Sequence, residues 1–263
     1  MFPPSRIACL TEETVETLYL LGEDKRIVGV SGYAVRPPQV RREKPRVAAF
    51  ISADVDKIVA LKPDLVLTFS DLQADIVAQL IRRNIAVHAF NQRDVTGILD
   101  MIRTLGALVG AAEKAEELAV SYEDRLDEIR ERAAALPRRP RVYFEEWDEP
   151  MISGIRWVSE LIEIAGGIEA FPALSVNKSA KDRIVMADDV IAVAPDIIIG
   201  SWCGKKFVPA KVTARPGFGT IPAVRDNALH EIKSTLILQP GPAALTEGLD
   251  HLVRIIGEWA ERG

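Results

Sequence analysis

The sequence predicts an α/β fold with two Rossmann-like lobes, each built on a parallel sheet and joined by a single long helix. Two observations support this prediction. Short apolar strands alternate with helices, which is typical of parallel βαβ units. A segment made of a helix end, a Pro-Asp turn and a buried strand also occurs twice, at residues 56–67 and 189–199. The copies lie about half the chain apart, too far for a solenoid repeat, which indicates two similar lobes.

The first half of the chain gives the clearest elements. Gly22 ends the first helix, since glycine suits the backbone conformation at a helix C-terminus. Pro63 ends another helix before a strand, because proline cannot continue the helical hydrogen bonds. The periodicity predicts strands at 6–10, 26–31, 65–69 and 85–90 and helices at 12–21, 54–60 and 71–83.

A long helical stretch follows from about residue 94 to 136, with a break near Gly110. From 111 to 136 there is no proline or glycine, and apolar residues recur at steps of three and four, which gives one buried stripe. At about 1.5 Å per residue this helix spans about 40 Å, enough to connect two lobes; a surface helix within one lobe is the alternative. We expect an N-terminal lobe at 1–110, an interlobe helix at 111–137 and a C-terminal lobe at 138–263. In the last lobe, strands are predicted at 141–145 and 197–200.

Composition narrows the class of protein. The net charge of −5 argues against nucleic-acid binding, which needs a basic surface. Two cysteines cannot form a disulfide framework. No stretch reaches the roughly 18 to 20 apolar residues of a membrane span, so no membrane insertion is expected.

The candidate site follows from the fold. Ligands of open parallel sheets bind beyond the carboxyl ends of the strands, so we expect a ligand cleft between the lobes. Three of the four tryptophans fall in or near loops of the second lobe, and such rings suit a large, flat, partly apolar ligand; alternatively, they cap the edge of the core. The predicted ligand-binding residues are Cys9, Glu12, Tyr33, Phe50, Ser70, Glu145, Trp147, Arg156, Trp157, Trp202 and Cys203.

We expect no catalytic residues, no resident metal and no intrinsic cofactor. The sequence has no nucleophile elbow, no Gly-rich phosphate loop and no zinc-protease motif. Glu145 and Glu146 are neighbours on a strand and point to opposite faces, so they cannot act as a carboxylate dyad. Cys9 and Cys203 could ligate a soft metal or react with a bound molecule; the alternative is that both are small buried hydrophobes.

Several segments occur in a characteristic order, at 6–22, 27–31, 56–67, 157–167, 215–225 and 238–242. Their order and spacing resemble those of the helical-backbone (class III) substrate-binding proteins of ABC transporters, which capture cobalamin, haem and ferric siderophores. Segment 145–154 is most similar to the cobalamin-binding branch. The resemblance implies a monomer that captures a corrinoid or another large metal chelate, such as cobalamin or a ferric chelate, for ABC-type uptake.

The resemblance also implies docking to an ABC permease. The family usually carries one exposed glutamate on each lobe for this purpose. Asp71 and Asp75 are the nearest counterparts in the first lobe, whereas the second-lobe loop at 205–215 is basic. Like charges there would oppose docking to permease arginines.

A second hypothesis follows from that basic loop and from the N-terminus. No signal peptide is visible, so we expect a periplasmic location if a signal has been removed and a cytoplasmic one otherwise. The alternative function is an intracellular cofactor-handling protein or an enzyme on the same scaffold, using Cys9, Cys203 or Glu145.

Overall fold

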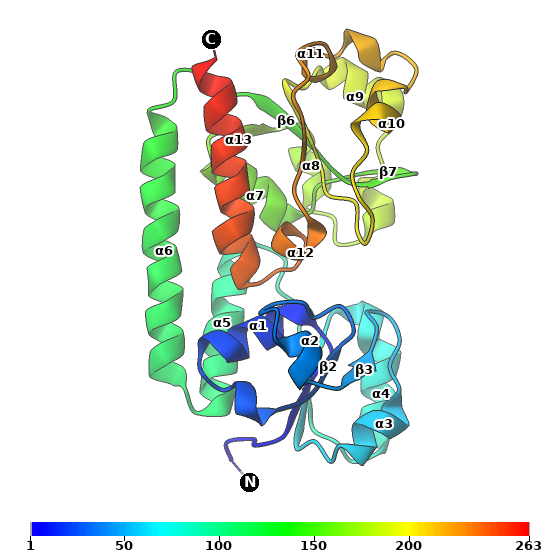
Figure 1. Ribbon diagram of the computed structural model, residues 1–263, viewed down its shortest axis with the longest axis vertical. Coiled ribbons are helices and arrows are strands. Elements are labelled where there is room, and N and C mark those ends of the chain that lie inside the picture. The colour runs from blue at the N-terminus through cyan, green and yellow to red at the C-terminus, as the bar shows by residue number, and fades with distance from the viewer. Residues whose placement is uncertain (1, 263) are drawn as a thin grey trace. The chain divides into compact units, whose positions relative to one another are not determined.

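The computed structural model describes residues 2–262, which divide into two compact units. Unit 1 contains the residues up to Gln92 together with Thr96–Tyr122, and unit 2 contains Arg93–Val95 together with the residues from Glu123 onward. Each unit has its own five-stranded sheet covered by helices (Figure 1). The predicted pair of α/β lobes is therefore confirmed.

The sheet of unit 1 is entirely parallel, in the order β3-β2-β1-β4-β5. Its central strand places Cys9 between Val30 and Leu67. Strands β1 and β4 are buried along their whole length, as expected for apolar runs in a parallel sheet. The strands are β1 Ile7–Cys9, β2 Ile27–Ser31, β3 Arg46–Ala48, β4 Leu65–Phe69 and β5 Val87–Phe90.

Helices cover both faces of this sheet. On one face Ile58 of α3 and Leu80 of α4 pack with Ala8 and Val66 of the sheet in one buried cluster, and α1 covers the other face (Figure 1). The helices are α1 Glu12–Leu20, α2 Val40–Glu43, α3 Val55–Ala60, α4 Ala74–Arg82 and α5 Val95–Val109. Strand β3 and helix α2 were not predicted, because each is short and begins next to charged residues.

The sheet of unit 2 has the order β10-β9-β6-β7, with β8 also paired to β6. Strand β7 runs antiparallel to β6, and the other pairings are parallel. We expected the residues after Glu145 to form a loop, but β6 continues to Asp148 and turns back into β7. The strands are β6 Arg141–Asp148, β7 Met151–Ser153, β8 Ile168–Glu169, β9 Ile197–Gly200 and β10 Leu229–Glu231.

Unit 2 is rich in short helices, three of which begin with proline at or next to the first helical position, where its missing amide hydrogen costs nothing. The last helix is longer and contributes Leu252 and Ile256 to the core. The helices are α7 Arg156–Ile164, α8 Pro172–Ser175, α9 Ala187–Val193, α10 Pro209–Thr213, α11 Pro222–Arg225, α12 Ser234–Ile237 and α13 Leu249–Glu261.

The predicted repeat extends to individual hydrogen bonds. In unit 1, Asp64 accepts from the backbone amide of Arg6 at 2.9 Å, and the Arg6 guanidinium donates to carbonyls at the end of α3. In unit 2, Asp196 accepts from the amide of Arg141 at 2.8 Å, and Arg141 donates to Val193 O at the end of α9. Each aspartate after the proline therefore fixes the start of the neighbouring strand.

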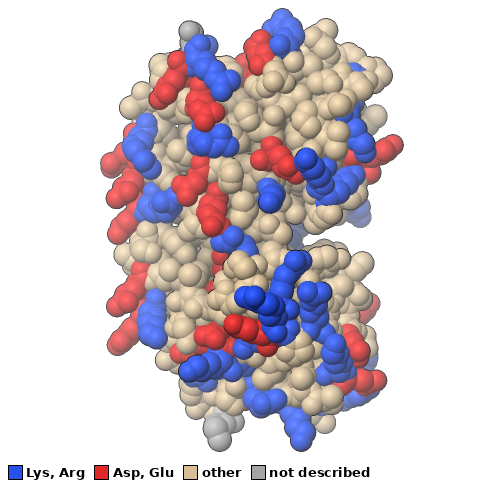
Figure 2. All heavy atoms as spheres, viewed as in Figure 1, with Lys and Arg blue, Asp and Glu red and all other residues tan. Residues whose placement is uncertain are grey.

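The long helical stretch is broken where expected. Gly110 has a φ of +77°, a conformation that favours glycine, and it separates α5 from α6, Ala112–Ala134. The predicted apolar stripe of α6 is buried, and acidic and basic side chains alternate on its outer surface (Figure 2). The division between the units falls within α6, after Tyr122. Within residues 2–262, no helix combines the length and the apolar character that a membrane crossing needs.

Candidate functional site

The carboxyl edge of the unit 1 sheet exposes large apolar side chains after three of its strands. Tyr33 follows β2 and is 56% exposed, Ile51 follows β3 and is 70% exposed, and Leu72 follows β4 and is 57% exposed. Apolar side chains this exposed are costly when they gather at one edge, and such groups mark binding surfaces. Only Tyr33 was predicted. Ile51 follows a strand that the sequence did not predict, and after the predicted strand 65–69 only Ser70 was singled out as a ligand-binding residue.

Gln73 holds this edge together. Its Oε1 accepts from the amide of Phe69 at 3.0 Å, and its Nε2 donates to Leu10 O at 3.2 Å and to Phe50 O at 2.8 Å. The side chain is fully buried, so one amide joins the ends of β1 and β4 to the segment after β3. The predicted residue Ser70 lies beside it and accepts from the amide of Leu72 at 3.3 Å.

Three predicted or neighbouring polar groups lie beneath the edge and are buried. Burial raises the pKa of Glu12, although the carboxylate accepts from Ser31 Oγ at 2.7 Å. Burial and the charge of Glu12 together raise the pKa of Glu13 to about 8. Burial raises the pKa of the Cys9 thiol to about 12, so this cysteine stays protonated and unreactive near neutral pH.

In unit 2, Glu145 is a fully buried carboxylate with four hydrogen bonds. Oε1 accepts from Trp202 Nε1 at 2.9 Å and from Arg215 at 2.9 Å. Oε2 accepts from Tyr143 Oη at 3.0 Å and from Arg215 at 2.5 Å. Burial alone would lower the pKa of Arg215, but the hydrogen bonds and charge of Glu145 outweigh it and raise that pKa.

Trp147 and the basic loop form a second cluster in unit 2. Lys205 Nζ lies 3.9 Å from the centre of the Trp147 ring, within cation–π distance. Lys205 also pairs with Asp148, and Lys211 approaches the same carboxylate at 3.8 Å. The basic loop is therefore partly neutralised by acids of β6, which the linear sequence did not reveal.

The remaining predicted residues of unit 2 lie apart from this cluster or are buried. Trp157 is 3% exposed and donates to Ile237 O at 2.8 Å, and Trp202 is 2% exposed. Arg156 pairs with Asp94 at 3.3 Å and with Glu160 at 3.0 Å. Cys203 is exposed. As ligand contacts, all four remain predictions, but the two buried indole rings already serve as core residues.

The predicted docking acids Asp71 and Asp75 are both exposed, at the start of the segment that leads into α4. Among the described residues, no group of three or more His, Cys, Asp or Glu side chains is arranged to hold a metal ion.

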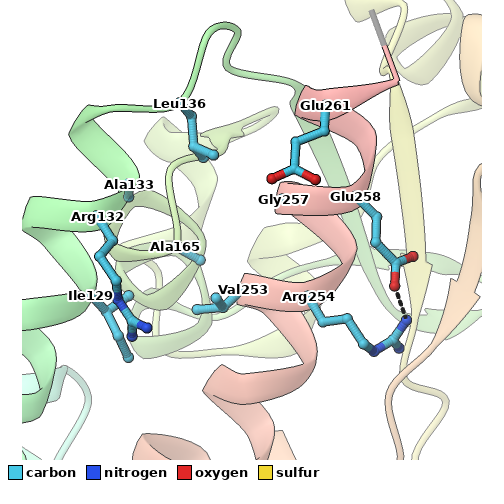
Figure 3. Close-up of a pocket in the computed structure, with 10 residues that line it drawn as sticks. All are labelled: Ile129, Arg132, Ala133, Leu136, Ala165, Val253, Arg254, Gly257, Glu258 and Glu261. Carbon is cyan, nitrogen blue, oxygen red and sulfur yellow. Dashed lines mark hydrogen bonds and ion pairs between the residues drawn. The ribbon is translucent and has the colours of Figure 1, made fainter.

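A groove of about 290 Å³ in unit 2 lies between α6, α13 and the end of α7 (Figure 3). Alkyl groups of Ile129, Leu136 and Val253 line it, and charged residues of α13 stand at its rim. None of the predicted site residues lies in this groove, so the candidate residues remain those described in each unit by itself.

Comparison with known proteins finds relatives that match much of the chain. The uncharacterised ABC transporter substrate-binding lipoprotein YvrC of Bacillus subtilis is 27% identical over 264 residues, which is 96% of this chain and 80% of the relative. A vitamin B12-binding protein of Vibrio cholerae is 27% identical over 204 residues, which is 76% of this chain and 71% of the relative.

Solved structures share the fold. The periplasmic haem-binding protein RhuT from Roseiflexus sp. RS-1 superimposes with a TM-score of 0.84 at 21% identity, covering 97% of this chain and 99% of that protein. The periplasmic vitamin B12-binding protein BtuF of Vibrio cholerae gives 0.79 at 22% identity, covering 99% of each chain.

The family model for periplasmic binding proteins matches residues 7–236. That range begins at β1 and runs into α12, so it includes both sheets and both carboxyl edges. The resemblance inferred from the sequence is confirmed, and the chain belongs to the periplasmic binding protein family.

Proposed function

We propose that this protein binds a corrinoid or another large metal chelate and delivers it to an ABC permease. The observation that carries the proposal is the apolar edge of unit 1, where Tyr33, Ile51 and Leu72 are each more than half exposed. A macrocycle or chelate with a broad apolar face would cover these side chains, as ligand sites combine apolar surface with a few polar groups. Proteins similar to this chain are named for vitamin B12 and for haem, and both of these ligands are large metal chelates.

The site supports binding better than catalysis. Cys9 is a buried thiol with a pKa of about 12, and Glu145 has its oxygens occupied by Arg215, Trp202 and Tyr143. Neither group is available as a nucleophile or as a general base. The alternative of an enzyme that uses these residues is therefore not favoured.

Delivery to a permease is part of the proposal. Asp71 and Asp75 are exposed and would face permease arginines. The basic loop of unit 2 opposes docking less than its sequence suggests, because Asp148 pairs with Lys205 and lies near Lys211. Since a permease recruits its binding protein outside the cytoplasmic membrane, we propose a periplasmic or membrane-anchored location.

The test combines isolation with titration. Protein purified from its native host is examined by absorption spectroscopy and mass spectrometry for a bound chromophore, and the apoprotein is titrated with cyanocobalamin and with haemin. Ile51→Ser should weaken binding several-fold through lost apolar contact. Ile81→Ser is the matched control, because Ile81 is 58% exposed on α4 and lies outside the strand ends. Absence of any chromophore and of binding to both probes would refute the proposal.

A further inference from the structure

The two neighbouring acids of β6 hold two different segments of unit 2. Glu145 pairs with Arg215, whereas Glu146 pairs with Arg183 at 2.7 and 3.2 Å. Arg183 has a side chain only 2% exposed, and it also donates to Ser153 O. The pairing of β6 with β7 shifts register between Glu145 and Trp147, and at this irregularity the two neighbouring acids meet arginines from two different segments.

Glu145 has no free position for a ligand. A carboxylate offers about four acceptor positions, and Trp202, Tyr143 and the two nitrogens of Arg215 fill four. Its backbone carbonyl accepts from the amide of Ser201 at 2.9 Å as well. One residue thus joins β6 to both ends of the segment 201–215.

We propose that Glu145 is a positioning residue that anchors the segment 201–215, and that Glu146 anchors the segment 176–183 in the same way. The segment 201–215 follows β9 at the carboxyl edge and carries Lys205 beside Trp147. Any effect of this anchor on ligand affinity rests on the proposed function. Removing the negative charge leaves a guanidinium that is 15% exposed for Arg215 and 2% exposed for Arg183 without its ion-pair partner, which is unfavourable. In each case the arginine side chain then moves into solvent, and the segment that carries this arginine moves away from the sheet.

Trypsin tests the anchor without any ligand, because both segments contain its cleavage sites. Glu145→Gln should increase the rate of cleavage after Lys205, Lys206 and Lys211 by about tenfold or more, since cleavage of a folded protein follows the population of the open form. Glu146→Gln is the matched control, because its ion pair with Arg183 holds a different segment. It should increase cleavage after Lys181 and leave the sites at 205–211 close to their rate in the native protein.

A double variant separates positioning from stability. Glu145→Gln with Arg215→Gln removes the uncompensated charge, so the unfolding temperature should recover from that of the single variant. Cleavage at 205–211 should remain as fast as in Glu145→Gln. The affinity for cyanocobalamin or haemin should be lower than that of the native protein in both variants. If cleavage returns to the native rate together with stability, the pair only balances charge and the inference is wrong. If the native protein binds neither probe, the proposed function fails while the trypsin rates still decide the anchor.

Discussion

Buried acids in the two units are neutralised by different means. Glu145 faces Arg215 and keeps an ionic partner, whereas Glu13 is 2% exposed and adjoins Glu12, a like charge. An acid in that environment favours the protonated form. A buried glutamate is thus accommodated by an ion pair in unit 2 and beside a second carboxylate in unit 1.

We predict that Glu13→Gln stabilises the protein at high pH more than at low pH. Between its ordinary pKa of 4.5 and its folded value of about 8, the unfolded chain releases the proton while the folded chain keeps it. Stability therefore falls as pH rises through this window, on the order of a few kcal/mol in all. Urea unfolding at pH 5 and pH 8 measures the effect, with the exposed Glu113→Gln as control. An equal shift at both pH values would contradict it.

The tryptophans of unit 2 should separate into two kinds. We predict that Trp147→Ala lowers ligand affinity with little loss of stability, because its ring is half-buried and one face meets Lys205. Trp202→Ala should cost about 3–5 kcal/mol of unfolding free energy, because its ring is 2% exposed and its Nε1 bonds Glu145. Thermal unfolding and cyanocobalamin titration of both variants test this. Equal destabilisation would show that Trp147 is also a core residue.

At the scale of elements, the repeated Pro-Asp turn joins helix, turn and strand through one carboxylate. Burial alone would raise the pKa of Asp64, but hydrogen bonds from Ser5 and Arg6 outweigh it and lower that pKa. We predict that Asp64→Ala loses about 1–3 kcal/mol of stability, since it removes the hydrogen bonds that Ser5 and Arg6 donate to this carboxylate just before β1. Denaturant unfolding at neutral pH measures the loss. Asp56→Ala, an exposed site in the same repeat with a surface ion pair to Arg83, should cost much less.

Two glycines, one within α13 and one just before it, should change the stability of the protein in opposite directions when they are replaced by alanine. A Cβ at Gly257 would meet nothing within 4 Å, at the groove of unit 2 (Figure 3), whereas a Cβ at Gly248 would lie 2.5 Å from Leu236 O. Gly257→Ala should raise stability by about 0.5–1 kcal/mol through helix propensity. Gly248→Ala should lower it, because a backbone carbonyl must move. Thermal unfolding distinguishes the two, and a loss of stability in both would contradict the open space at Gly257.

For the whole molecule, α6 is a helix whose residues are divided between the two units. We propose it as the interlobe helix, because its residues are divided between the units after Tyr122. A continuous helix limits relative motion, so ligand binding should require little reorganisation. We predict that the radius of gyration from small-angle X-ray scattering changes little when cyanocobalamin or haemin is added. A large decrease on binding would show that α6 bends.

The elements of the fold could be predicted because they depend on local patterns. The apolar run at 65–69, the Pro-Asp turns and Gly110 each act over a few residues, and the structure has strands, turns and a helix break at these places. The strand beyond Glu145 could not be predicted in this way. In the sequence, Glu146 and Asp148 resemble loop residues. Their positive partners, Arg183 and Lys205, are distant in sequence and become evident only in the structure.

The candidate site was predicted less completely for the same reason. Tyr33 and Ser70 follow clear strands and lie at the edge, whereas Gln73, Ile51 and Leu72 gave no signal strong enough to single them out. The burial of Trp157 and Trp202 could not be predicted from the sequence either, because it depends on contacts with the distant residues Ile237 and Glu145.

The sequence by itself determined the fold class, the repeat and the family, because periodicity and turn chemistry are properties of neighbouring residues. Only the tertiary structure decided which polar residues are buried and what neutralises them. A buried charge needs a partner in space, and that partner can lie anywhere in the chain. Glu145 and Arg215 are 70 residues apart, so no local pattern could pair them.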